Sequence, residues 1–239
     1  MENNKKIKLI IGLFYIIFVI LFLYLIFSKF TFEEITSYEF IRNNREYFEN
    51  LRETNFLLLS FLFLLFTFVW VLAGGFGSPI GLFAGFIFGK WLGTLILIFG
   101  MSIGATTLYL FANFFLKDLI KEKFLNKYQS LENKFKKSEL IYLLVYRFIG
   151  GIPFAISNIL PCIFNVKVNN FFWATFLGIT PQIFLVCSIG SGLEKLIDNN
   201  LEPPSIFEII SSNEIYIPLI IFVILVFVTI YLRKLFYKN

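Results

Sequence analysis

Long apolar runs alternate with short polar segments along the chain, and several runs have the length of a membrane span. Residues 9–27 carry no charged side chain and would reach about 28 Å as a helix, close to the thickness of the hydrocarbon core. This run is longer than the apolar part of a signal peptide, and no small-residue cleavage site follows it. We therefore predict a retained first transmembrane helix at 9–27.

A polar segment and a second apolar region come next. Residues 28–54 hold four basic and six acidic side chains, and we expect them to be helical at a membrane surface. Residues 55–116 contain one charged residue, Lys90, and are too many for a single span. Three glycines and a proline between residues 73 and 79 interrupt the region. The pattern predicts a helical hairpin followed by a transmembrane helix.

The second half of the chain repeats this organisation. A basic loop is predicted at 117–139, which holds seven Lys and four acidic residues. Residues 140–192 form another broken apolar region, interrupted near Pro153 and again at Pro161. We predict a second hairpin plus helix over 140–192 and a last transmembrane helix at 215–232.

The charge distribution orients these segments. The N-terminus, the 117–139 loop and the C-terminus are rich in Lys, whereas the segments at 28–54 and 194–214 are acidic. Because Lys and Arg are enriched on the cytoplasmic side, the pattern fits four full spans and cytoplasmic termini if both hairpins return to the side they entered. We therefore predict an all-α integral membrane protein, a single membrane domain over 1–239. It would be an inverted repeat of two re-entrant helical hairpins, each followed by a transmembrane helix, between N- and C-terminal transmembrane helices. Broken segments at corresponding places in two halves indicate a membrane transport site.

Composition narrows the classes of protein. Hydrophobic residues make up 58% of the chain and charged residues 15%, which excludes a soluble enzyme, a disordered chain and a disulfide scaffold. The net charge of +5 lies mostly between the apolar runs and indicates membrane orientation rather than nucleic-acid binding. Cys162 and Cys187 are expected in the membrane core, with a disulfide or a catalytic thiol as the alternative. The chain has no His, and its two Cys form no CxxC pair, so we expect no metal site. We expect no cofactor either.

Small residues recur at four-residue intervals in the first repeat. They are Gly81, Gly85, Gly89 and Gly93, continued by Gly100 and Gly104 in the next helix. This spacing places a flat strip on one helical face, and we predict that it serves close helix packing. Hinges or kinks are expected at Pro161, Pro181 and Gly178, since proline removes a backbone donor.

Arg147 is the strongest candidate for a functional side chain. It is ionisable and lies in an apolar hairpin, where a charge costs about 2.5–3.5 kcal/mol at the centre of a span. Neither broken apolar region contains an acidic partner for it. A carboxylate from a loop, helix-end carbonyls, or a ligand phosphate bound bidentately by the guanidinium remain as partners.

The neighbouring breaks complete a candidate substrate-binding site. Free backbone N–H groups at Gly150 and Gly151, beside Pro153, would add to an anion site. Asn158 either contacts substrate or forms a hydrogen bond across helices. From the facing hairpin we add its Gly/Pro break, at Gly77 and Pro79. The lack of an intramembrane carboxylate argues against an ion-coupled pump and favours passive movement.

Residues 76–192 resemble the VTT-domain branch of the DedA superfamily, also called SNARE-associated Golgi proteins. The resemblance is carried by Gly77-Ser78-Pro79, Gly89, Gly93, Gly100 and Gly104 in the first half, and by Arg147, Pro153-Phe154, Asn158, Gly178, Pro181 and Gly190-Ser191 in the second. It implies two opposed re-entrant hairpins that meet near the membrane midplane, with a phosphate contact at Arg147. Family members are associated with phospholipid scrambling and, in bacteria, with recycling of undecaprenyl phosphate.

The chain departs from the family pattern in its polar residues. Gly150 stands where the family often has proline, and Asn113 where it often has arginine. The classical bacterial branch has acidic residues in the first hairpin, and this chain has none there. That branch also has a second arginine in the second hairpin, where this chain offers Asn158. These departures favour a plain phospholipid scramblase over a proton-coupled carrier of polyprenyl phosphate.

We therefore expect a lipid translocator that moves phosphate-bearing headgroups across the bilayer. The alternatives are a small-solute or ion secondary transporter and a membrane-protein assembly or insertion factor. An enzyme is disfavoured, since no catalytic carboxylate pair, His or G-x-S-x-G arrangement occurs. The expected partners are membrane lipids, phospholipid or polyprenyl phosphate, and not nucleic acid; a homo-oligomer is left open. Abundant Lys, Asn, Ile and Phe indicate an AT-rich genome, hence the inner membrane of a bacterium.

Overall fold

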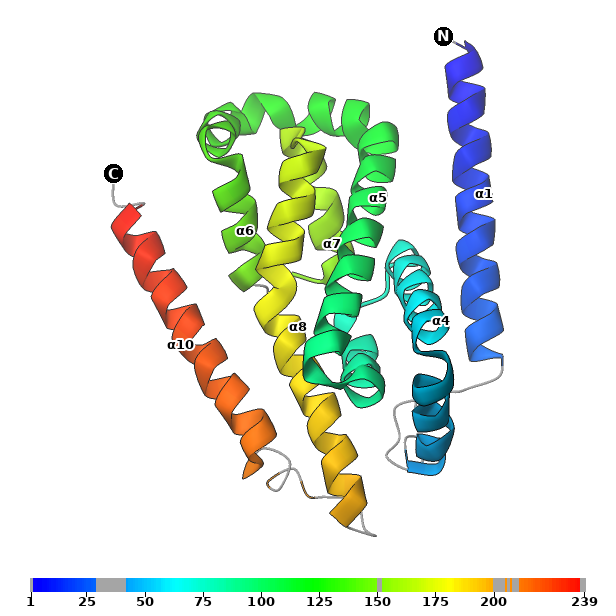
Figure 1. Cartoon of the computed structure of the whole chain (residues 1–239). Coiled ribbons are helices and arrows are strands. Elements are labelled where there is room, and N and C mark those ends of the chain that lie inside the picture. The colour runs from blue at the N-terminus through cyan, green and yellow to red at the C-terminus, as the bar shows by residue number, and fades with distance from the viewer. Residues whose placement is uncertain are drawn as a thin grey trace.

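The protein is all-helical. The computed structural model describes residues 2–28, 42–149, 152–199, 205, 207 and 211–236, and within these ranges every regular element is a helix. The elements are α1 (Glu2–Phe27), α4 (Arg45–Leu72), α5 (Gly77–Lys137), α6 (Glu139–Ile149), α7 (Phe154–Ile159), the 3₁₀ helix η1 (Leu160–Phe164), α8 (Val168–Asn199) and α10 (Asn213–Phe236). In Figure 1, α5 and α8 lie side by side at the centre, while α1 and α10 lie on opposite flanks. The predicted all-α class is confirmed.

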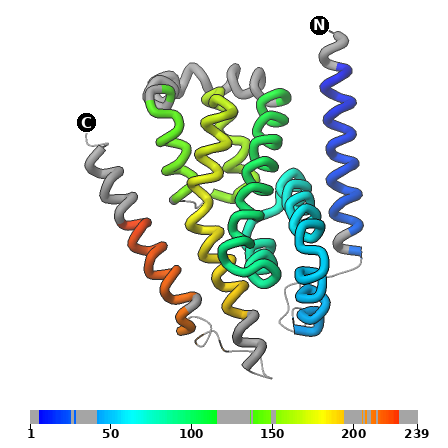
Figure 2. Tube along the Cα trace, in the orientation of Figure 1, coloured from blue at the N-terminus to red at the C-terminus, as the bar shows by residue number. Residues whose placement is uncertain are grey.

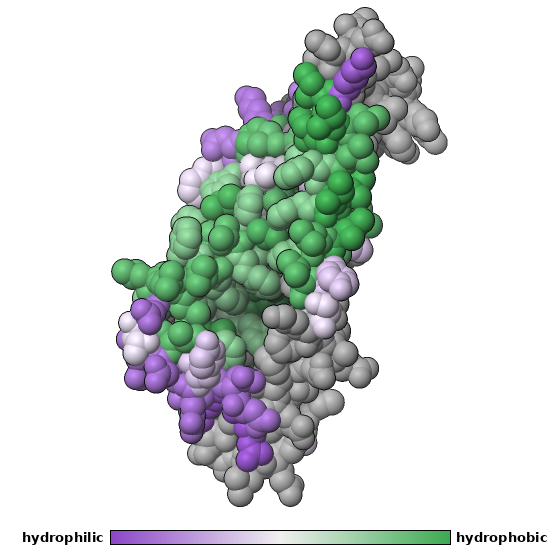
Figure 3. All heavy atoms as spheres, turned by 90° about the vertical axis from the view of Figure 1, so that its right-hand side faces the viewer, coloured by the Kyte–Doolittle hydropathy of each residue, from purple (hydrophilic) through white to green (hydrophobic). Residues whose placement is uncertain are grey.

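In the part of the chain that the structure describes, four helices are long and apolar enough to cross a membrane. They lie at Lys6–Leu25, Arg45–Leu72, Gly77–Phe115 and Val168–Leu193, and shorter apolar helices cover Phe154–Phe164 and Ile215–Phe227. Figure 3 shows hydrophobic side chains over the middle of the face that carries α1, with hydrophilic residues toward both ends. Exposed apolar surface of this extent belongs in lipid, and the protein is an integral membrane protein.

The chain reverses after α4 through a Schellman turn. The Gly75 N–H donates to the Trp70 carbonyl (2.9 Å), and the Gly74 N–H donates to the Val71 carbonyl (3.0 Å). Gly74 has a φ of +83°, a left-handed conformation that glycine adopts without a Cβ clash. The predicted Gly-rich break is thus a helix end closed by glycine. Pro79 follows in the first turn of α5, where the missing N–H is tolerated.

A second reversal lies inside α5, at Gly89. A Cβ built on Gly93 would lie 2.4 Å from the Ala84 carbonyl oxygen, although residues nine apart in a straight helix are separated by about 13.5 Å. The arm before Gly89 therefore folds back beside the helix that follows it (Figure 2). Gly89 has a φ of +74° and no atom within 4 Å of its built Cβ. The expectation that Gly89 packs like the rest of the glycine strip is wrong, because its role is to supply the left-handed backbone of this reversal.

Gly89→Ala is expected to lower the free energy of unfolding by about 1–2 kcal/mol, the strain of a Cβ in left-handed backbone. Gly89→Asn is expected to lower it less, because asparagine tolerates that conformation. Thermal unfolding in detergent micelles measures both variants against wild type. An alanine variant as stable as wild type would contradict the assignment.

The other strip glycines bring helices together. A Cβ on Gly85 would lie 2.0 Å from the Cys187 carbonyl oxygen, and one on Gly190 would lie 2.1 Å from the Leu82 carbonyl oxygen. The first arm of α5 therefore contacts α8 backbone to backbone. The remaining glycines also approach neighbours closely: Gly81 approaches Val186, Gly93 approaches Ala84, Gly100 approaches Thr67 and Gly104 approaches Val71.

In the second half, α6, α7 and η1 form a hairpin that leads into α8. Asn165 ends η1 in the left-handed conformation, with a φ of +47°. Tyr109 of α5 donates its hydroxyl to the Val166 carbonyl (2.6 Å), and Glu139 of α6 accepts from the Lys167 backbone N–H (2.6 Å). These bonds fix the end of the hairpin between α5 and α6.

The Lys-rich segment differs from its prediction as a loop. Residues 117–137 belong to α5, which continues to Lys137. No glycine or proline occurs between Gly104 and Lys137, and Lys, Glu and Leu are favourable helix formers. The polarity of the segment does not prevent it from being helical.

Candidate functional site

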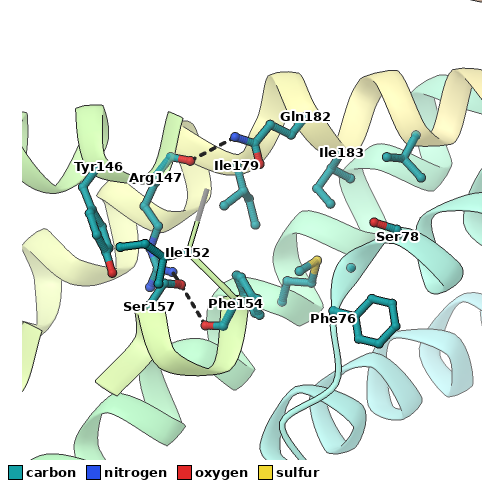
Figure 4. A pocket seen from close by; sticks show the side chains of 13 residues that line it. Phe76, Ser78, Tyr146, Arg147, Ile152, Phe154, Ser157, Ile179, Gln182 and Ile183 are labelled. Carbon is teal, nitrogen blue, oxygen red and sulfur yellow. Dashed lines mark hydrogen bonds between the residues drawn. The ribbon is translucent and has the colours of Figure 1, made fainter. Parts of the chain in front are cut away.

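A cavity of about 230 Å³ lies where the two hairpins meet. Its lining includes Phe76, Gly77 and Ser78 at the start of α5 and Arg147, Ile152 and Ser157 of the second hairpin. The middle of α8 forms another wall with Ile179, Gln182 and Ile183 (Figure 4). Segments far apart in sequence thus converge on one hollow beside the centre of α8.

Arg147 is the charged residue of this cavity. It lies in the last turn of α6 and is only 4% exposed. Its NH1 nitrogen donates to the Ser157 hydroxyl (2.5 Å), and its NH2 nitrogen donates to the Asn158 side-chain oxygen (2.7 Å). Among the described residues no carboxylate pairs with Arg147. Its described hydrogen-bond partners are therefore neutral, and no carboxylate in the described part of the chain compensates its positive charge.

Aromatic rings surround the guanidinium. Its central carbon lies 5.0 Å from the ring centre of Phe171, 5.4 Å from that of Phe154 and 6.0 Å from that of Tyr146. Ring faces attract a cation and stabilise it in a site with little water. They lower the cost of burying the charge without neutralising it.

Helix α8 holds the end of α6 in place. Gln182 donates its side-chain amide to the carbonyls of Phe148 (2.7 Å) and Arg147 (3.2 Å). The last carbonyls of a helix lack partners within the helix, so the amide acts as a cap from a neighbouring element (Figure 4). Gly178 lies one turn earlier on α8, and a Cβ there would lie 2.5 Å from the Arg147 Cβ. We predicted a hinge or kink at Gly178; in the structure this glycine lets α8 approach Arg147 of α6 closely.

Several hydrogen-bond donors around the guanidinium have no partner among the residues that the structure describes. They are Arg147 Nε, the Tyr146 hydroxyl and Asn158 Nδ2, and all three atoms are buried. The Ser157 hydroxyl donates to the Phe154 carbonyl (2.7 Å) and so presents an acceptor to Arg147. A buried donor without a partner is costly, and a positive charge with unpaired donors beside it matches an anion with several acceptor oxygens.

The structure brings some of the predicted site residues together and separates others. Arg147 donates a hydrogen bond to Asn158, and Gly77 lines the cavity. Pro79 is not among the lining residues, and Pro153 is exposed at the N-cap of α7. The predicted contacts of Gly150 and Gly151 lie outside the described residues.

The two remaining prolines shape helices near the site. Pro161 is the second residue of η1, which directly follows α7. Pro181 lies inside α8, next to Gln182. Cys162 and Cys187 are buried free thiols, which excludes a disulfide between them. Within the described part of the chain, no group of His, Cys, Asp and Glu is arranged to hold a metal ion.

Sequence reasoning missed three polar residues of the site: Tyr146, Ser157 and Gln182. Tyr146 and Ser157 are direct neighbours of the two residues that were singled out. Gln182 is an uncharged polar residue within a long apolar run, a signal that points to a hydrogen bond across helices.

The family profile of the VTT domain matches residues 76–192. The chain is a VTT-domain membrane protein. Its VTT domain begins directly after the turn that follows α4 and contains the reversal at Gly89, Arg147, and the part of α8 that lines the cavity. The resemblance predicted from the glycine, proline and arginine pattern is confirmed.

Curated relatives extend this assignment. The VTT-domain protein is 28% identical over 135 residues to a transmembrane protein 41 homolog of Caenorhabditis elegans, covering 54% of this chain and 55% of the relative. It is 29% identical over 110 residues to the uncharacterized protein YqeD of Bacillus subtilis, covering 45% and 52%, respectively. A transmembrane protein 41 homolog of Dictyostelium discoideum is 26% identical over 129 residues, covering 53% and 37%. The matches thus span about half or less of each relative. No solved structure gives a significant match to the chain.

Proposed function

We propose that this protein is a lipid translocator that moves phosphate-bearing headgroups across the bilayer, in the manner of a scramblase. The observation that carries the proposal is the buried guanidinium of Arg147, which lines a cavity between two helical hairpins and has no carboxylate partner in the described part of the chain. A lipid headgroup cannot cross hydrocarbon unaided, because its charge must remain solvated or paired. Arg147 would bind the headgroup phosphate, while the acyl chains stay in the surrounding lipid.

The proposed membrane arrangement is an inverted repeat of two re-entrant hairpins. In Figure 1, α4 and α6 enter their hairpins from opposite ends of the molecule, and both hairpin turns lie beside the middle of α8. Irregular backbone at membrane depth is stable when it is buried in protein or lines a cavity that contains water. The turns of both hairpins contribute residues to the cavity at Arg147, which fits this condition. The Lys-rich termini and the segment at 117–139 would lie in the cytoplasm of a bacterial cell, with the protein in its plasma membrane.

Movement through this site would be passive. The described lining contains no acidic residue that could bind a coupling proton or sodium ion. A bound phosphate would pair with Arg147 and accept from the free Tyr146 hydroxyl, so binding would satisfy donors that are otherwise without partners. The lipid would move down its concentration gradient. Between transport events, when no phosphate is bound, the aromatic rings would stabilise the guanidinium of Arg147.

Reconstitution in liposomes tests the proposal. Vesicles would carry phospholipids labelled with a fluorophore on an acyl chain, and dithionite would bleach only labels in the outer leaflet. Wild-type protein is expected to expose inner-leaflet label to bleaching, because labelled lipids cross the bilayer, whereas protein-free vesicles keep that signal. Arg45→Gln is a control for the removal of an arginine away from the cavity. Arg45 pairs with Glu49 of α4 (3.0 Å), and neither residue lines the cavity, so this variant should scramble at the wild-type rate. Wild-type rates equal to those of protein-free vesicles would contradict the proposed function.

A further inference from the structure

We propose that the cavity selects anionic phospholipids, whose headgroup phosphate carries no attached ammonium group, over zwitterionic ones. This inference rests on the proposed function and names its substrate class. A phosphatidylglycerol headgroup has the favoured chemistry, and phosphatidylethanolamine and phosphatidylcholine have the disfavoured one.

The first argument is the charge of the cavity. Its lining, as far as the structure describes it, contains Arg147 and no other ionisable group except the Tyr146 phenol. An anionic headgroup neutralises the guanidinium when its phosphate binds. A zwitterionic headgroup also brings an ammonium group into the same hollow of about 230 Å³, close to the guanidinium and without a carboxylate to bind it. Like charges at short range in a site with little water repel each other by several kcal/mol.

The second argument concerns the aromatic rings. Choline-like cations are bound in proteins by the faces of aromatic side chains. In this cavity the rings of Tyr146 and Phe154 lie beside the guanidinium of Arg147, with centroid distances of 6.0 Å and 5.4 Å. The protein's own cation therefore already occupies one face of each of these two rings, where a lipid ammonium group would otherwise bind.

The third argument is the set of groups without partners. Among the described residues, Arg147 Nε and the Tyr146 hydroxyl are buried donors that form no hydrogen bond. These groups match phosphate oxygens and a polyol headgroup, both of which accept hydrogen bonds. Arg147 Nε can only donate, so an ammonium group gains no hydrogen bond from it, and the Tyr146 hydroxyl can accept from an ammonium group as well as donate to a phosphate.

The experiment compares three phospholipids that share the same acyl-chain label and differ only in headgroup. Wild-type protein is expected to move phosphatidylglycerol about tenfold or more faster than phosphatidylcholine and phosphatidylethanolamine, because each tenfold corresponds to about 1.4 kcal/mol of the repulsion avoided. Equal rates above those of protein-free vesicles would overturn the preference and leave the proposed function standing. Rates equal to those of protein-free vesicles for all three lipids would overturn both.

A carboxylate placed in the cavity is a sharper test. Ser78→Asp puts an acidic group in the first turn of α5, where negative charge is favourable and the side chain is exposed, so the variant is expected to fold. It would compensate Arg147 and bind an ammonium group, and the ratio of phosphatidylglycerol to phosphatidylcholine rates should fall about tenfold. Ser78→Asn has the same shape as the aspartate variant without its charge, so the ratio should fall much further in Ser78→Asp than in Ser78→Asn. An unchanged ratio in Ser78→Asp, or the same fall in both variants, would overturn the proposal.

Free phosphate is the other source of this chemistry, and a third arm separates it from lipid. Proteoliposomes would be loaded with radioactive inorganic phosphate, and its release would be compared between wild type and Arg147→Met. We expect no difference, because the proposed ligand is the lipid headgroup. Release that depends on Arg147, together with equal rates for the three lipids, would assign the cavity to a free anion and overturn the proposal.

Discussion

Vesicles that contain Arg147→Met are expected to scramble phospholipid roughly 10- to 150-fold more slowly than vesicles with wild-type protein. The range corresponds to about 1.5–3 kcal/mol, the contribution of a hydrogen bond to a charged group. Methionine preserves much of the length and the apolar stem of the side chain, so it can still pack beside Phe154 and Phe171, although the contacts between the cation and these rings are lost. The measurement is the dithionite bleaching rate, with detergent-extracted protein checked for folding by size-exclusion chromatography.

A second variant separates a ligand-binding role of Arg147 from a purely structural one. Asn158→Asp gives the guanidinium an ion-pair partner at the position whose side-chain oxygen already accepts from it at 2.7 Å. If the uncompensated charge binds lipid phosphate, this variant should be at least as stable as wild type and yet scramble about tenfold more slowly, because the phosphate must displace a carboxylate. If Arg147 only ties the hairpin together, the ion pair should leave scrambling unaffected. A stable variant with the wild-type rate would therefore contradict the ligand-binding role.

Gly85→Ala is expected to destabilise the protein by about 2–3 kcal/mol, although alanine is the better helix former. Its Cβ would lie 2.0 Å from the Cys187 carbonyl oxygen, a backbone atom that cannot rotate away. The first arm of α5 and α8 would have to separate, and this would also widen the cavity that both elements line. Thermal unfolding in detergent micelles and the scrambling rate measure the two consequences.

Gly12→Ala is the matched control for this substitution. Gly12 also lies in an apolar helix, but its built Cβ meets only the edge of the Phe115 ring, at 3.5 Å. We expect this variant to be as stable as wild type or more stable by up to about 1 kcal/mol, the difference in helix propensity. Equal unfolding temperatures for Gly85→Ala and Gly12→Ala would show that the backbone contact between α5 and α8 is not tight.

The sequence predicted the class of the protein because the signal is local and strong. Uncharged runs as long as the hydrocarbon core can be stable only as membrane helices, and glycine and proline clusters interrupt such helices wherever they occur. The break after α4 was predicted from Gly74 and Gly75, which form the Schellman turn. The boundary of the Lys-rich segment was less well predicted, since polarity decides where a segment lies and not whether it is helical.

The role of Gly89 could not be predicted from spacing. Gly81, Gly85 and Gly93 share its four-residue interval, yet only Gly89 among these four adopts a positive φ. The conformation of a glycine depends on where the tertiary fold requires the chain to reverse, and periodicity does not encode this.

By itself, the sequence determined that Arg147 would have to be stabilised without an acidic neighbour from the broken apolar regions at 55–116 and 140–192, because these contain no Asp or Glu. Only the tertiary structure decided which groups stabilise it. Ser157 and Asn158 reach it from the other arm of its hairpin, and Gln182 caps its helix from a residue 35 positions further along the chain. The packing of helices that are distant in sequence decides which partners reach Arg147. The pattern of polar and apolar residues along the chain indicates that a charge is buried, but it does not indicate where the groups that stabilise this charge lie.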